Sequence, residues 1–180
     1  MAKIRGCLAL GCGGAQARLL EPLALAMRRT GWDVQLMDVS ANKRAAPLND
    51  ARDAYALLAL RAHGVAVVGL GAGSTVAMLL AEQYAVSALV CLAPEPGDGR
   101  KARSLARLAA RNLFAVVAPT LVVQPASGRG SPACGVRRIL KGVSASECRA
   151  MWLNSAYPLG APGVERDHTL AAILEHLSRI

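Results

Sequence analysis

The chain has 180 residues, 53% of them hydrophobic and only 3% aromatic, and it carries a formal net charge of +9. This length predicts a single domain over residues 1–180, with a core filled mainly by Ala, Leu and Val. Because no stretch approaches the roughly 18–20 uninterrupted apolar residues of a membrane span, we expect neither a spanning segment nor a membrane partner.

The start of the chain and the cysteines indicate a cytoplasmic protein. The segment MAKIRGCLAL resembles a lipoprotein signal, with basic residues, a short apolar run and a cysteine. Its apolar run is only about half the usual 7–15 residues, so a buried first strand is predicted instead. The five cysteines lack CxxC spacing, and we therefore expect no disulfide framework, no metal and no cofactor. Cys7 and Cys91 are expected in the core.

Apolar runs and helical patterns alternate along the whole chain. In chain order they predict a strand at 4–10, a helix at 16–29, a strand at 32–39, a helix at 50–62, a strand at 65–70, a helix at 72–84, a strand at 86–93, a helix at 100–112, a strand at 118–125, a helix at 132–141, a strand at 148–154 and a helix at 166–178. Asn49 is expected to cap the second helix. The pattern predicts a three-layer α/β/α fold with about six parallel strands, and such sheets bind ligands at the carboxyl ends of the strands.

The stretch GLGAG, Gly69 to Gly73, lies where a strand passes directly into a helix. A P-loop would need a lysine after its second glycine, and no lysine lies near this turn. The stretch instead matches the nucleophile elbow G-x-S-x-G, except that Gly71 replaces the serine. The flanking glycines give the clearance that such a sharp turn needs.

A second glycine turn, Gly11–Gly14, offers an alternative interpretation as a dinucleotide-binding site. It follows the first strand, and Asp38 stands at the end of the second strand, as in the Rossmann layout. Counting G-x-G-x-x-G from Gly11 places Gln16 where a small residue should allow close packing of helix on sheet. Binding of an NAD-type nucleotide through Gly11–Gly14 and Asp38 is therefore kept as an alternative.

The elbow and its neighbours resemble the α/β-hydrolase fold superfamily along nearly the whole chain. LALGCGG is similar to that family's oxyanion-loop strand, VSALVCLAPEP to the strand after the elbow, and VAPTLVVQPASG to the strand that presents the catalytic acid. The resemblance implies a sheet of strand order 2-1-3-4-5-6, in a minimal core without the family's first two strands or any cap.

The same resemblance implies that the family's Ser–acid–His triad is missing. Gly71 replaces the serine, and Ser127 stands in the loop where the acid belongs. The loop where the histidine belongs contains Tyr157 and Gly163. We therefore predict a degenerate, non-catalytic hydrolase scaffold.

The electrostatic part of such a site needs no triad. The amides of Ala72 and of Cys12 or Gly13 would point to one spot beside Gly71, where they suit an oxyanion or a carboxylate. We predict a small acyl or anionic ligand, or a protein partner, at this site, with Ser127 as a further ligand-binding residue. The alternative is that the glycines serve only the steric needs of the turns.

Substitute nucleophiles provide an enzymatic alternative, a carboxylic ester or thioester hydrolase. Cys12 lies at a helix N-terminus, a position that lowers the pKa of a thiol, and Ser74 lies in the first turn of the elbow helix. His168 is the candidate base, and Tyr157 and Asp167 are candidates for proton transfer. The Ser74 hydroxyl is otherwise expected to bond back to its own helix.

Four arginines form a stripe on one predicted helix face, at three- and four-residue steps: Arg100, Arg103, Arg107 and Arg111. The stripe suits an anionic partner such as nucleic acid, or a solvated face in a protein of alanine- and arginine-rich, bacterial-like composition. No aromatic residues are interleaved and no nucleic-acid-reading motif is present, which favours the solvated face.

Overall fold

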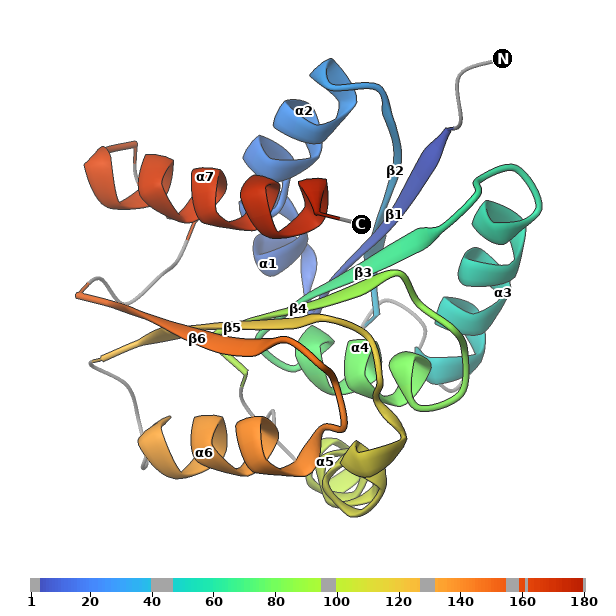
Figure 1. Cartoon of the computed structure of the whole chain (residues 1–180), viewed down its shortest axis with the longest axis vertical. Coiled ribbons are helices and arrows are strands. Elements are labelled where there is room, and N and C mark those ends of the chain that lie inside the picture. Colours follow the sequence, from blue (N-terminus) through green and yellow to red (C-terminus); the bar gives the residue numbers. More distant parts are fainter. Residues whose placement is uncertain are drawn as a thin grey trace.

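A parallel sheet forms the centre of the computed structural model, which describes residues 4–39, 47–94, 100–126, 132–154, 159–160 and 162–179 (Figure 1). Within these ranges the strands are β1 (Arg5–Gly11), β2 (Trp32–Asp38), β3 (Val65–Leu70), β4 (Ala88–Leu92), β5 (Thr120–Pro125) and β6 (Cys148–Leu153). They pair in parallel in the order β2-β1-β3-β4-β5-β6. The predicted fold class and strand order are confirmed.

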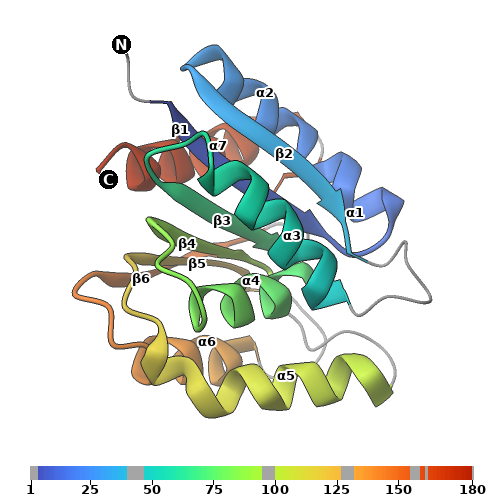
Figure 2. The same cartoon turned by 90° about the vertical axis from the view of Figure 1, so that its right-hand side faces the viewer.

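Helices cover both faces of the sheet, and the two apolar cores lie between the layers. One face carries α1 (Gly14–Leu19), α2 (Glu21–Arg29) and α7 (Val164–Ser178), and the other carries α3 (Pro47–Ala59), α4 (Gly73–Ala81), α5 (Arg100–Asn112) and α6 (Pro132–Gly142) (Figure 2). A single 3₁₀ turn, η1 (Leu113–Ala115), follows α5. Among the described helices, none is long and apolar enough to cross a bilayer.

The central strands are buried on both faces, as parallel sheets in this architecture require. All residues of β3 and β4 are buried, which explains why they read as continuous apolar runs. Cys7 and Cys91 are fully buried among them, as expected, and burial raises the pKa of each thiol to about 12.

Several helix boundaries differ from the prediction by a few residues, and two of the differences have a clear local cause. The helix expected at 16–29 is divided into α1 and α2 at Leu20, two residues before Pro22. Proline has no amide hydrogen, and its ring crowds the carbonyl four residues earlier, so a continuous helix is disfavoured there. The next helix, α3, begins at Pro47, so Asn49 lies inside it and is not its cap.

Candidate functional site

The turn from β3 to α4 has the shape of a nucleophile elbow. Gly71 adopts a φ of 58°, and its amide donates to the Leu92 carbonyl at 2.8 Å. A Cβ on Gly69 would lie 2.4 Å from the Cα of Ser74, and one on Gly73 would lie 2.2 Å from the Leu10 carbonyl oxygen. Both distances are far below van der Waals contact, so these glycines are required sterically.

The space over Gly71 is occupied by the side chain of Gln16. A Cβ built on Gly71 would lie 2.7 Å from Gln16 Nε2, 2.9 Å from its Oε1 and 3.1 Å from its Cδ. Gln16 lies in the first turn of α1, and its Oε1 accepts a hydrogen bond from the Cys12 amide at 3.1 Å. The carboxamide therefore lies where the side chain of an elbow nucleophile would project.

The amides predicted to bind an anion in the first glycine turn already have acceptors within the protein. The Cys12 amide donates to Gln16, and the Gly13 amide donates to Asp38 Oδ1 at 2.8 Å. The Ala72 amide lies at the N-terminus of α4, where amides have no acceptor within the helix. Asp38 and Gly13 are also the groups that the dinucleotide interpretation requires, and here they bind each other.

Ser74 is fully buried and does not bond to its own helix. Its Oγ donates to the Gly69 carbonyl at 2.8 Å and lies 3.3 Å from the Leu92 carbonyl. These carbonyls belong to β3 and β4, so the expected bond within the helix is wrong. Because α4 starts close to the ends of β3 and β4, the strand carbonyls are nearer to the Ser74 hydroxyl than the carbonyls of its own helix. The hydroxyl thus holds the elbow helix to the sheet.

Cys12 is half-buried, and its pKa is not lowered. Burial, and after it the negative charge of Asp38, raise the pKa of the thiol. The expected effect of a helix N-terminus is outweighed because burial disfavours the thiolate and an acidic side chain lies beside the turn.

Two of the remaining candidates, Asp167 and His168, lie on α7. His168 and Asp167 are exposed in the second and first turns of α7, and Asp167 forms an ion pair with Arg166. Ser127 and Tyr157 lie outside the described residues. In the described part of the chain, no group of three His, Cys, Asp or Glu residues is placed to hold a metal ion.

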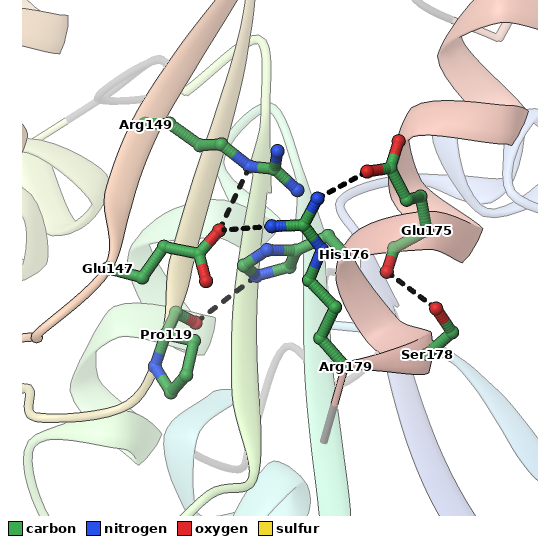
Figure 3. Close-up of polar contacts among 7 residues, drawn as sticks. All are labelled: Pro119, Glu147, Arg149, Glu175, His176, Ser178 and Arg179. Carbon is green, nitrogen blue, oxygen red and sulfur yellow. Dashed lines mark hydrogen bonds and ion pairs between the residues drawn. The ribbon is translucent and has the colours of Figure 1, made fainter.

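A polar cluster that the sequence did not reveal lies at the opposite, amino edge of the sheet (Figure 3). His176 is 1% exposed, and its Nε2 lies 3.3 Å from the Pro119 carbonyl, just before β5. Beside it, Glu147 Oε1 accepts from Arg179 Nη1 at 3.2 Å and forms an ion pair with Arg149 at 3.4 Å. The cluster fastens the end of α7 to the starts of β5 and β6.

No protein-family model and no curated protein sequence matches the chain. Solved structures do match. The structure described as LipS and LipT, two metagenome-derived lipolytic enzymes, has 14% identity and a TM-score of 0.84, covering 100% of this chain and 96% of that one. The Paleococcus ferrophilus monoacylglycerol lipase has 13% identity and a TM-score of 0.75, covering 98% and 95%. The enol-lactonase of Burkholderia xenovorans LB400 has 12% identity and a TM-score of 0.73, covering 98% and 92%. The chain therefore has the α/β-hydrolase fold, as its sequence predicts.

Proposed function

We propose that this protein is a non-catalytic α/β-hydrolase-fold protein that binds a small acyl or other carboxylate-bearing ligand at the elbow. The observation that carries the proposal is the Gln16 carboxamide over Gly71, with its oxygen on the Cys12 amide. A neutral carbonyl oxygen already uses this donor, and a carboxylate is a stronger acceptor for the same kind of group.

The environments of the two substitute nucleophiles, Ser74 and Cys12, support a non-catalytic role. The Ser74 hydroxyl is buried and committed to strand carbonyls. The Cys12 thiol has a raised pKa, so little of it is the reactive thiolate at neutral pH. Both observations disfavour the esterase or thioesterase alternative.

Chemical labelling tests the absence of catalysis. The purified chain should show no burst with p-nitrophenyl acyl esters and no labelling by a fluorophosphonate probe or by a thioester substrate analogue. Mass spectrometry that located a covalent adduct on Ser74 or Cys12 would contradict the proposal. In that case Ser74→Ala or Cys12→Ala should abolish turnover.

Ligand binding is tested separately, by following backbone amide shifts while butyrate or octanoate is added. The Cys12 and Ala72 amides should respond. Gln16→Ala should tighten binding, because no internal acceptor competes for the Cys12 amide. Gln16→Glu should weaken it, because the new side chain supplies a tethered carboxylate. Gln35→Ala, in the middle of β2, is the control. Equal affinity in all four proteins would exclude the elbow as the ligand site and leave a protein partner as the alternative.

A further inference from the structure

The net charge of the protein comes from one continuous segment. Residues 100–146 contain nine of the 21 Lys and Arg residues and none of the 12 Asp and Glu residues. The rest of the chain is therefore electrically balanced. Both helices of this segment, α5 and α6, cover the same face of the sheet (Figure 2). The segregation concentrates positive charge on that face.

Basic side chains of both helices are exposed there. They are Arg107, Arg111, Arg137, Arg138 and Lys141. Among the described residues, each ion pair uses an arginine from elsewhere in the chain, namely Arg61, Arg149, Arg166 or Arg179. Within the described part of the chain, these five basic side chains thus form no ion pair, and their charges are available to an anionic surface.

Large apolar side chains are exposed in the same layer. Leu108, between two of the arginines of α5, is 43% exposed, and Phe114 and Val117, at and after η1, are each 66% exposed. On the inner side of the same segment, Ala109 and Leu113 are buried in the core. The segment from α5 to residue 117 therefore exposes apolar side chains as well as arginines.

We propose that this α5–α6 face, the five basic residues together with Leu108, Phe114 and Val117, binds the surface of an anionic lipid bilayer. Arginines suit lipid phosphates, and the apolar side chains would enter the headgroup–acyl boundary. A nucleic acid offers phosphates too, but binding of its exposed bases relies on aromatic stacking platforms, and Phe114 is the only aromatic residue among the eight that define this face. The sequence led us to expect no membrane partner because it has no long apolar stretch. Hydropathy does not show which apolar side chains are exposed beside the arginines.

Vesicle flotation of the full chain tests the proposal. The protein should float with vesicles of mixed phosphatidylcholine and phosphatidylglycerol at low salt, and not with pure phosphatidylcholine. Arg107→Gln with Arg111→Gln should weaken partitioning about thirtyfold, given the contribution of each basic residue near an anionic surface. The control pair, Arg18→Gln with Arg29→Gln, removes the same charge from exposed sites on α1 and α2 and should change little.

The apolar side chains distinguish a bilayer from a nucleic acid. Leu108→Ser and Phe114→Ser should each weaken vesicle binding about tenfold, and both changes lie at exposed positions that circular dichroism can verify as folded. Failure to float with anionic vesicles would overturn the proposal. Tighter binding to duplex DNA or single-stranded RNA than to vesicles, unchanged by Leu108→Ser, would also overturn it in favour of a nucleic-acid partner.

Discussion

The two edges of the sheet hold different kinds of group. At the carboxyl edge, where this architecture binds ligands, the elbow presents Gly71 and is filled by the uncharged side chain of Gln16. At the amino edge, His176 is buried beside an acid and two arginines (Figure 3), and Glu82 is half-buried at the end of α4. His176 and Glu82, whose pKa values are shifted by burial, therefore lie at the edge opposite the expected ligand site. A shifted pKa by itself does not identify a functional site.

The largest expected effect concerns the steric requirement at the carboxyl edge. Gly73→Ala should destabilise the protein by about 3 kcal/mol or more, because its Cβ would collide with a backbone carbonyl that cannot move independently. Urea unfolding measures the change. Gly135→Ala, in α6 with nothing within 4 Å of its added Cβ, is the control and should stabilise by about 0.5–1 kcal/mol. Equal stability of Gly73→Ala and the native protein would contradict the packing of α4 on β1.

The next effect concerns Glu82 at the amino edge. Its Oε1 is buried without a hydrogen-bond partner among the described residues, and burial raises the pKa of the carboxyl to about 7. The unfolded chain ionises near 4.5, so the free energy of unfolding should fall as pH rises from 4.5 to about 7, and then level off. Glu82→Gln should remove this slope and stabilise by on the order of 2 kcal/mol in mildly alkaline buffer. The exposed Glu21→Gln serves as control, and a slope retained in Glu82→Gln would refute the assignment.

His176 should give a slope of the opposite sign. Burial, followed by the charge of Arg149, lowers its pKa below 6.5, against the opposing effects of the Pro119 carbonyl and Glu147. The folded protein then binds fewer protons than the unfolded chain, so the free energy of unfolding falls as pH drops through 6.5. His176→Gln keeps a donor for the Pro119 carbonyl and should lose this dependence, which urea unfolding at a series of pH values measures.

The controls for that experiment replace the two exposed histidines, His63→Gln and His168→Gln. Imidazole NMR of the native protein gives the titration of His176 directly, even if the variant does not fold. A titration midpoint of His176 at or above the ordinary histidine value would contradict its burial in the amino-edge cluster.

The smallest expected effect is the coupling between substitutions of Gly71 and Gln16 at the elbow. Gly71→Ala should cost about 1–2 kcal/mol, because φ is positive and the new methyl group meets the Gln16 side chain. In the Gln16→Ala variant, Gly71→Ala should cost about 0.5 kcal/mol less, because the new methyl group no longer meets Gln16 and only the cost of the positive φ remains. A double-mutant cycle in urea measures the difference. Purely additive effects would mean that Gln16 does not lie over Gly71 in solution.

The fold could be predicted from the sequence because its signals are local and periodic. Alternating apolar runs and helical patterns gave the element order, and the glycine spacing gave the elbow. Pro22 is a local signal for the division between α1 and α2. The continuous apolar periodicity of residues 16–29 nevertheless led us to predict one helix. Such features depend on neighbours along the chain.

The contacts of the site could not be predicted in the same way because they join distant residues. Gln16 was noticeable only as the residue that breaks the dinucleotide fingerprint, and its position over Gly71 depends on how α1 packs beside the elbow. The bond from Gly13 to Asp38 and the Ser74 bonds to strand carbonyls likewise arise only when the sheet is assembled. The roles proposed for Ser127 and Tyr157 stay predictions.

The position of Gln16 also constrains the order in which mutations could introduce a nucleophile. A serine placed at residue 71 first would meet the carboxamide and would have to displace it from the Cys12 amide. A smaller residue at position 16 would have to come earlier, while it brought no catalytic advantage of its own. A two-step path whose first step brings no advantage is hard for selection to follow, so the contact between these two turns acts as a barrier to placing a nucleophile at residue 71.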